Sequence, residues 1–294
     1  MKERTVGLIG VGLMGSALAE RLLASGIRVI GHDQSEERRE SLTALGGVWS
    51  PTPQDVFQRC ELVLLALPDA KVTKRVLQES LPGELREGLT IIDTGAGGPD
   101  EVAAIGQELE ARGIRYLDAT IAGSSEQMRR REAPLLVGGT TDVVQSLSPL
   151  WEALGPHWFY VGSCGSGARM KLVSNLVMGL NRAALAEGLA LAEACGLDPE
   201  LTLTVLRAGD AYSRILDMKG RKMIDRDFAP QARLRQHVND VDLILALAES
   251  AGARVPLSEA HGNLLSEAKN RGLGELDNSA VILALAAENN SKKT

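Results

Sequence analysis

The residues whose types and spacing could do chemistry lie in two short stretches, one near the start of the chain and one past its middle. Lys171 and Asn175 stand in the second stretch, 165–175 (GSGARMKLVSN). They are one helical turn apart, so both side chains would project from one face of a helix. A lysine whose pKa is lowered can transfer a proton, and an amide beside it can hold a polar substrate. An isolated lysine near a helix start is usually a solvated residue, so this assignment depends on the rest of the chain.

The first stretch is a glycine-rich turn. Three glycines in G-x-G-x-x-G spacing separate an apolar run at 5–9 from an apolar helical pattern at 13–24. Such glycines permit a tight turn, close approach of a pyrophosphate, and close packing of helix on strand, and the helix N-terminus would face the phosphates. The stretch therefore predicts a dinucleotide site. Its predicted cofactor contacts are Gly10, Gly12, Leu13, Met14 and Gly15.

An acidic residue follows the next expected strand. The apolar run at 28–32 ends at Asp33, the position from which a carboxylate grips the ribose diol of a dinucleotide. A carboxylate there repels a 2′-phosphate, so NAD is favoured over NADP. Arg38 and Arg39 on the following helix leave NADP possible, although a solvated helix face is their more common explanation.

The alternation of strand and helix continues through the first half of the chain. Nearly continuous apolar strands are expected at 61–67, 89–93, 114–118, 134–137 and 158–161. Such strands are typical of a parallel sheet covered on both faces, whose carboxyl ends line the cofactor crevice. The fold class predicted is an α/β Rossmann-type doubly wound sheet. Further cofactor contacts are expected at strand ends, at Leu67, Pro68 and Ala96.

Helical periodicity dominates after Gly165. Runs are expected from 165 to about 194, after Pro199, and at 234–251, 256–270 and 279–288. We expect a dinucleotide-binding Rossmann domain at 1–163 and an all-helical domain at 164–294 that closes over the substrate and supports dimerisation. A long helix would join them.

Composition excludes several classes of function. The 294 residues are 44% hydrophobic and 24% charged, with a net charge of −6 and a pI near 5.4, so nucleic acid and anionic membranes are not expected partners. Three scattered cysteines make neither a disulfide framework nor a zinc site. With no apolar signal core before the first strand and no run long enough to span a bilayer, we expect a cytoplasmic protein.

The only dense basic run is Arg129, Arg130 and Arg131. A solvated helix face is the more common explanation. The functional alternative is that one guanidinium reaches back to an acidic group of the substrate.

Taken together, these motifs resemble the β-hydroxyacid dehydrogenase family, which includes 3-hydroxyisobutyrate dehydrogenases and tartronate semialdehyde reductases. The resemblance covers nearly the whole chain and includes 7–15 (GLIGVGLMG), 165–175, 186–200 and 274–280. It implies that Lys171 is the catalytic acid/base, that Asn175 holds the substrate, and that two helix-linked domains form a homodimer or homotetramer. The implied substrate is a small anionic hydroxyacid or semialdehyde.

The chain departs from the family pattern around the substrate. The usual substrate-binding serine is Ala122, the usual Ser-Thr pair is Gly95-Ala96, the usual Lys-Asp pair is Asn239-Asp240, and the usual phenylalanine is Asn278. Lost hydroxyl groups predict a roomier pocket suited to a larger or polyoxygenated acid. Ser124 or a water could instead substitute for the lost serine. The expected substrate contacts are Ala122, Gly123, Ser124, Asn175 and Asn239.

Three functions remain open at this point. The first is a dehydrogenase or reductase acting on CH–OH groups, and the retained Lys171 favours it. The second is an imine reductase-like enzyme, a related type that usually has another residue at the lysine position. The third is a non-catalytic dinucleotide-binding protein. No metal is expected, because the nicotinamide supplies the redox chemistry and no histidines or cysteines stand at metal-ligand spacing.

Overall fold

The computed structural model describes residues 5–81, 83 and 88–285. Contacts divide the chain into two compact units, Met1–Lys171 and Leu172–Thr294, so the division falls inside one long helix. The domain limits expected from the sequence, 1–163 and 164–294, stay predictions.

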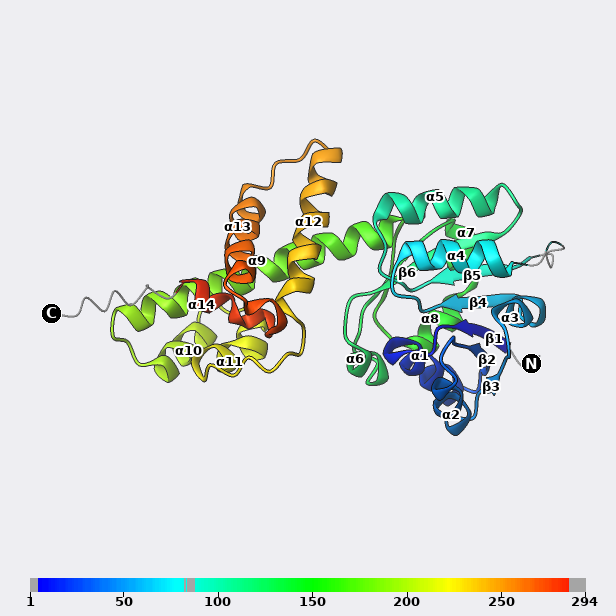
Figure 1. The fold of residues 1–294 in the computed structure, drawn as a ribbon, viewed down its shortest axis with the longest axis horizontal. Helices are drawn as coiled ribbons and strands as arrows, with labels where there is room; N and C mark the ends of the chain where they lie inside the picture. The colour runs from blue at the N-terminus through cyan, green and yellow to red at the C-terminus, as the bar shows by residue number, and fades with distance from the viewer. Residues whose placement is uncertain (1–4, 82, 84–87, 286–294) are drawn as a thin grey trace. The chain divides into compact units, whose positions relative to one another are not determined.

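The first unit contains an eight-stranded sheet in the order β3-β2-β1-β4-β5-β6-β7-β8 (Figure 1). Every neighbouring pair is parallel except β6 and β7. The predicted α/β doubly wound fold is therefore confirmed. The strands are β1 Thr5–Ile9, β2 Arg28–His32, β3 Val48–Trp49, β4 Leu62–Leu65, β5 Thr90–Asp93, β6 Arg115–Ile121, β7 Leu135–Gly138 and β8 Trp158–Gly162.

Two strand features differ from the prediction. β3 has only two residues, too few for a recognisable apolar run, and it was missed. β6 continues to Ile121, where the sequence was interpreted as a loop from 119 onward. The extension has a physical reason, since Ala119, Thr120 and Ile121 pair with the antiparallel strand β7 and are buried.

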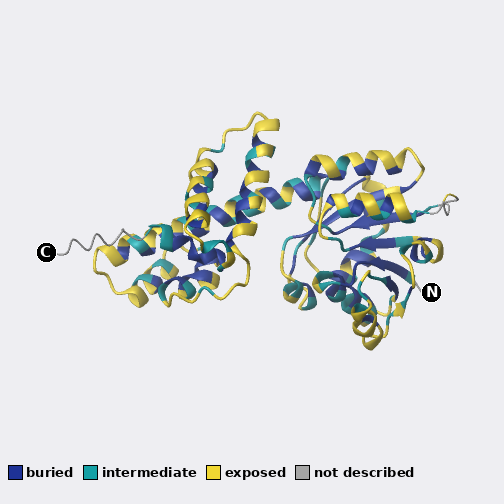
Figure 2. Cartoon of the chain, in the orientation of Figure 1, coloured by how far each residue is buried: buried dark blue, intermediate teal, exposed yellow. Residues whose placement is uncertain are grey.

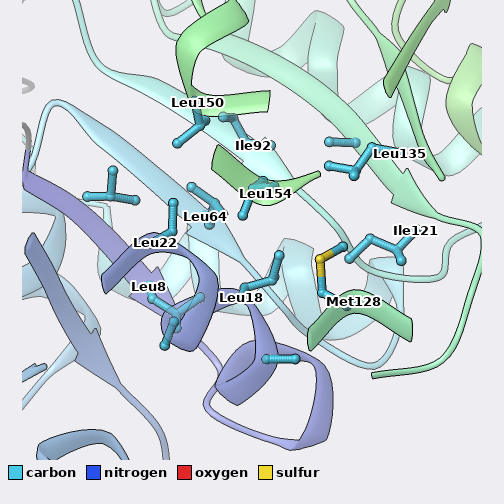
Figure 3. Packing of buried hydrophobic residues seen from close by; sticks show 14 of the residues in the cluster. Leu8, Leu18, Leu22, Leu64, Ile92, Ile121, Met128, Leu135, Leu150 and Leu154 are labelled. Atoms are coloured by element: carbon cyan, nitrogen blue, oxygen red, sulfur yellow. The ribbon is translucent and has the colours of Figure 1, made fainter. Parts of the chain in front are cut away.

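Helices cover both faces of the sheet. Successive strand residues point to opposite faces, and accordingly Leu8 and Leu64 join one apolar core while Ile9 and Leu65 join another. Figure 3 shows the first core, where residues of β1 and β4 meet those of α1, α6 and α8. Figure 2 shows the central strands as the buried layer, whereas the edge strands β3 and β8 are half-buried or exposed. The helices of this unit are α1 Leu13–Ala24, α2 Glu37–Ala44, α3 Pro53–Arg59, α4 Ala70–Ser80, α5 Pro99–Glu110, α6 Ser125–Arg129, α7 Thr141–Ser146 and α8 Ser148–Leu154.

The second unit is helical throughout its described part. A core of leucines, valines and alanines holds its helices together, and α12 packs along α13. The elements are α9 Ser166–Ala194, α10 Pro199–Ala208, the π-helix η1 Leu216–Gly220, α11 Arg221–Ile224, α12 Leu234–Ser250, α13 Pro256–Asn270, the 3₁₀ helices η2 Leu273–Glu275 and η3 Asn278–Val281, and α14 Ile282–Leu285. α9 begins in the first unit and ends in the second.

The last predicted helix, 279–288, is only partly as expected. It is a 3₁₀ turn followed by the short helix α14, and residues 286–288 lie outside the described part of the chain. Within residues 5–81, 83 and 88–285, no helix is long and apolar enough to cross a membrane.

Candidate functional site

The glycine turn between β1 and α1 has the geometry that a dinucleotide requires. Gly10 adopts a φ of 94°, and a Cβ atom there would overlap the carbonyl oxygen of Ala66 at the end of β4. A Cβ atom on Gly15 would overlap the carbonyl oxygen of Gly10. Both positions therefore need glycine, the first for its backbone angle and both for close packing.

Gly12 differs from its two neighbours in the motif. No described atom lies within 4 Å of the place where its Cβ would be, so this side of the turn is open. Gly12 is the N-cap of α1, and within the described chain no side chain caps that helix and no acid stands in its first turn. The N–H groups at Leu13 and Met14 are thus available, and they suit the pyrophosphate of a nicotinamide dinucleotide.

Asp33, at the end of β2, is tied to the glycine turn. Its Oδ2 accepts the backbone N–H of Val11 at 2.7 Å, and its Oδ1 accepts that of Ser35 at 2.9 Å. The carboxylate is therefore held in place beside the turn. Each oxygen retains a further lone pair, and ribose hydroxyls are suitable donors to it.

The ends of β4 and β5 lie against each other. A Cβ atom on Gly95 would lie 2.8 Å from the carbonyl oxygen of Leu67, so the serine usual in the family would be crowded here. Gly95 N–H donates to Asp93 Oδ1 at 2.8 Å, and Tyr116 OH donates to Asp93 Oδ2 at 2.8 Å. Burial raises the pKa of Asp93, and the hydrogen bonds from Gly95 and Tyr116 oppose that change. Pro68 and Ala96, both predicted cofactor contacts, are exposed at these strand ends.

The segment after β6 carries three of the predicted substrate contacts. Ala122 N–H donates to the carbonyl of Pro134 at 2.9 Å, which ties the segment to the sheet. Ser124 is the N-cap of α6: its Oγ accepts Gln127 N–H at 3.2 Å, and its own N–H donates to Gln127 Oε1 at 2.9 Å. Ser124 thus has a structural role as a cap, and only its hydroxyl proton is left to donate to a ligand.

Asp118 anchors the beginning of α9 to the sheet. This buried carboxylate of β6 accepts the N–H of Gly165 at 3.0 Å and that of Ala168 at 3.1 Å. Burial raises its pKa, while the backbone N–H groups oppose that change. Sequence reasoning took Asp118 only as part of a motif and missed this contact. Lys171, half-buried, follows Ala168 within the next turn of α9.

Asn175 lies one turn after Lys171 on α9 and has a partner on α12. Its Nδ2 donates to Asp240 Oδ2 at 3.4 Å. Asn239, the predicted substrate contact beside Asp240, is exposed. Asn278 is 6% exposed, and its Oδ1 has no hydrogen-bond partner among the described residues. The structure therefore brings together Asn175 and Asp240, a pairing that the sequence did not indicate.

The three arginines at 129–131 make ion pairs and hydrogen bonds with other residues of the sheet unit. Arg129 pairs with Glu20 at 3.1 Å, Arg130 with Glu132 at 3.2 Å, and Arg131 donates to the carbonyl of Glu152 at 2.8 Å. These contacts favour the solvated-face explanation over a substrate contact. Within the described residues, no group of three histidine, cysteine or acidic side chains could hold a metal ion.

The sheet, the open helix N-terminus and the glycine turn define a dinucleotide-binding protein with a helical second unit. Comparison with protein families agrees with this class. Residues 5–162 match the model described as the NAD binding domain of 6-phosphogluconate dehydrogenase, and residues 165–285 match that described as NAD-binding of NADP-dependent 3-hydroxyisobutyrate dehydrogenase. The chain belongs to the β-hydroxyacid dehydrogenase family, as its motifs predicted, and the predicted nicotinamide cofactor is likewise confirmed.

Individual relatives cover nearly the whole chain. The 2-hydroxy-3-oxopropionate reductase of Escherichia coli is 30% identical, over 98% of this chain and 99% of that protein. Glyoxylate/succinic semialdehyde reductase 1 of Arabidopsis thaliana is 28% identical, over 95% of this chain and 98% of that protein. A solved structure of Mycobacterium tuberculosis 3-hydroxyisobutyrate dehydrogenase with L-serine has the same fold, with a TM-score of 0.88 at 22% identity over 97% and 99% of the two chains. The names of these relatives support an oxidoreductase acting on small molecules.

Proposed function

We propose that this protein is a nicotinamide-dependent dehydrogenase or reductase that interconverts a small hydroxyacid and the corresponding semialdehyde or oxo acid. The observation that carries the proposal is the pair Lys171 and Asn175, one turn apart on α9 in a chain whose glycine turn fits the cofactor. The reductases named among its relatives act on substrates of this class.

The chain's own residues would divide the work as follows. The N-terminus of α1 and the open side of Gly12 hold the pyrophosphate, and Asp33 accepts hydrogen bonds from the ribose. The bound nicotinamide supplies hydride exchange with the substrate carbon. Lys171 takes the hydroxyl proton during oxidation and returns it during reduction. Exclusion of water from the ammonium would favour the neutral amine that the oxidation needs.

The substrate we propose is an anionic acid larger or more oxygenated than 3-hydroxyisobutyrate. The family's serine is Ala122 here, so a small carboxylate loses one side-chain donor, and Ser124, whose Oγ already accepts a hydrogen bond as a helix cap, has only its hydroxyl proton to offer in its place. Losing one hydrogen bond to a charged group costs on the order of 1.5–3 kcal/mol, which is tenfold or more in kcat/KM. Gly123 N–H, the Ser124 hydroxyl, Asn175 and Asn239 are the remaining candidate donors.

A substrate screen with matched lysine variants tests the proposal. NADH and NADPH oxidation are followed with semialdehydes, oxo acids and cyclic imines, and the reverse reaction with hydroxyacids. Lys171→Met should lower kcat by about a hundredfold to ten-thousandfold while the cofactor dissociation constant stays the same. Lys74→Met, which removes an exposed lysine of α4, is the control and should behave as wild type. Undiminished turnover by Lys171→Met, or a wild type active only on imines, contradicts the proposal.

The same assay measures cofactor choice, and sedimentation measures assembly. We propose that NAD(H) gives the higher kcat/KM because Asp33 repels a 2′-phosphate, and an equal or higher value with NADP(H) would refute this preference. We also propose at least a homodimer, since two-fold assemblies are common among such enzymes. Sedimentation of the active enzyme as a monomer would refute that part.

A further inference from the structure

A group of buried basic side chains lies in the helical unit and has no part in the proposed chemistry. It consists of Arg182 on α9, His237 on α12 and His261 on α13, which are 1%, 3% and 4% exposed. We call these three residues the buried basic cluster. Nitrogen atoms of all three have no hydrogen-bond partner among the described residues, namely Arg182 Nε and Nη2 and the Nε2 atoms of His237 and His261. Buried polar groups of this kind are uncommon and call for an explanation.

The buried basic cluster is connected to Asn175 through one carboxylate oxygen. His237 Nδ1 lies 3.7 Å from Asp240 Oδ2, and the same Oδ2 accepts the Asn175 side-chain amide at 3.4 Å. The rings of His237 and His261 are 5.1 Å apart and tilted by 47°. The contacts therefore run from His261 to His237, from His237 to Asp240, and from Asp240 to Asn175.

A glycine allows α9 to approach the two histidines this closely. Gly179 is one turn after Asn175 on α9, and a Cβ atom there would lie 2.6 Å from His237 Nε2 and 3.0 Å from His261 Cε1. Asn175, Gly179 and Arg182 follow each other at helical spacing, so they share one face of α9. The face that carries Asn175 is thus the face against which His237 packs.

Burial, more than the charges around it, favours the neutral form of His237. Burial lowers the pKa of His237, the Asp240 carboxylate opposes that change, and the Arg182 guanidinium adds to it. Burial, His237 and Arg182 lower the pKa of His261 to about 4. Burial lowers the pKa of Arg182 to about 10, against the carboxylates of Asp277 and Asp240, so Arg182 is still charged at neutral pH. Lys219, which is close enough to Arg182 for the two charges to interact, is paired with Asp277 at 2.8 Å.

A neutral histidine carries its single proton on one of two nitrogens, and its neighbours decide which. The Asp240 carboxylate is 3.7 Å from Nδ1, in electrostatic contact rather than in a hydrogen bond, and its negative charge favours the form with the proton on Nδ1. We propose that His237 is a positioning residue, which through Nδ1–H holds the Asp240 carboxylate in the orientation that fixes the Asn175 amide. This inference rests on the proposed function, in which Asn175 contacts the substrate.

Fixing the amide has a chemical consequence. The side chain of asparagine carries an acceptor on one side and two donors on the other, and a half-turn about its last bond exchanges them. With Nδ2 committed to Asp240, Oδ1 and the second N–H of Asn175 have defined positions. A hydroxyl group of the substrate could then donate to Oδ1, and a carbonyl or carboxylate oxygen could accept from the second N–H. Loss of His237 would let the amide turn and weaken substrate binding.

A double-mutant cycle on the purified full-length enzyme tests this inference. His237→Phe keeps a ring of similar size and removes the donor, and we expect KM for the best substrate of the screen to rise about tenfold or more, with a smaller change in kcat. His237→Asn retains an N–H near the place of Nδ1 and should recover most of the loss. His157→Phe, at an exposed histidine of the other unit, is the matched control and should have wild-type kinetics.

The decisive comparison uses Asn175→Ala. If His237 acts through Asn175, the double variant should have the KM of Asn175→Ala alone, because the amide that His237 orients is gone. A merely structural role would lower stability and multiply the two effects. Asp240→Asn gives a second cycle with Asn175→Ala should His237→Phe fail to fold, since Asp240 is only partly buried. The inference is wrong if the two substitutions of a cycle raise KM by factors that multiply in the double variant. It is also wrong if Asn175→Ala leaves KM unchanged.

Failure of this inference and failure of the proposed function are separable. The Lys171 variants and the substrate screen judge the function, whereas the cycle judges only how Asn175 is held. If Lys171→Met abolishes turnover while the effects of His237→Phe and Asn175→Ala on KM are independent, the proposed function stands and the positioning role of His237 is wrong. A wild type without oxidoreductase activity on any compound refutes both.

Discussion

Among the described residues, five of the seven buried side-chain atoms without a hydrogen-bond partner belong to the helical unit, and the other two, on Arg21 and Thr73, lie on helices of the sheet unit. In the sheet unit, the carboxylates of Asp93 and Asp118 accept hydrogen bonds from Gly95, Tyr116 and the first turn of α9. In the helical unit, the buried basic cluster has nitrogens without a partner among the described residues. Loops at strand ends and helix N-termini offer spare backbone N–H groups, whereas helix interiors use theirs internally. A buried polar residue inside a helix bundle must therefore find another side chain.

Asp277 confirms this explanation from within the helical unit. It stands between two short 3₁₀ helices rather than inside a helix, and it accepts the backbone N–H groups of Gln231, Ala232 and Ser279 as well as the Lys219 ammonium. Although burial would raise the pKa of Asp277, these donors hold it well below its usual range. Irregular backbone thus satisfies a buried charge in both units, and regular helix does not.

The largest effect that separates the units should come from Gly15→Ala. Its added Cβ would overlap the carbonyl oxygen of Gly10, and backbone cannot yield as a side chain can. We expect the sheet unit to lose about 3 kcal/mol or more of its free energy of unfolding. Gly12→Ala, where the Cβ meets no described atom within 4 Å, is the matched control and should fold normally while binding the dinucleotide more weakly.

Urea unfolding followed by tryptophan fluorescence reports on the sheet unit alone, because Trp49, Trp151 and Trp158 all belong to it. Equal stability of the Gly15→Ala and Gly12→Ala proteins would show that the tight turn does not depend on the absence of a Cβ.

The next effect should come from breaking a buried charge pair in the helical unit. Lys219→Met leaves the Asp277 carboxylate, which is 0% exposed, without its cation. Removing one partner of a buried pair typically costs about 3–5 kcal/mol, and the remaining N–H donors to Asp277 should keep the loss near the lower value. In the sheet unit, Tyr116→Phe removes one donor from Asp93 and should cost about 1–3 kcal/mol.

Circular dichroism and tryptophan fluorescence, recorded on the same urea series, assign each loss to a unit. Lys219→Met should shift the helical signal and leave the tryptophan transition in place, and Tyr116→Phe should shift the tryptophan transition. The comparison between units fails if Lys219→Met costs less than Tyr116→Phe.

Much of the fold was predictable because its signals are local. The glycine turn, the acid at Asp33 and the apolar strands depend on neighbouring residues, and β1, α1 and β2 have the limits that the sequence indicated. β3 and the π-helix η1 were not predictable, since two residues or a single turn carry no periodic signal. The assignments of individual residues to cofactor and substrate remain predictions.

The partners of the site residues were less accessible from the sequence. Asp118 is 47 residues from Gly165, and Asn175 is 65 from Asp240, and no local pattern links positions so far apart. One signal for the buried basic cluster was available: Arg182 stands seven residues after Asn175, on the same face of α9. A charged residue on a helix face that is otherwise buried is a reason to look for a polar cluster.

The smallest effect, and the one most specific to the helical unit, is the loss of that unit's stability at low pH. In the unfolded chain His261 takes up a proton near pH 6.5, whereas in the folded protein its pKa is about 4. Between these values the unfolded chain binds more protons, so stability falls as the pH falls through this window and levels off below it. From pH 7 to pH 5 this one residue should cost roughly 2 kcal/mol, and His237, whose pKa is also lowered, should add to the loss. His261→Phe should reduce the loss of helical stability over this range by about that amount, as measured by circular dichroism in urea at each pH, while His157→Phe in the sheet unit should leave it unchanged. If the helical transition of His261→Phe depends on pH as steeply as that of the wild type, His261 is not held neutral by its burial and the contrast between the units is wrong on this point.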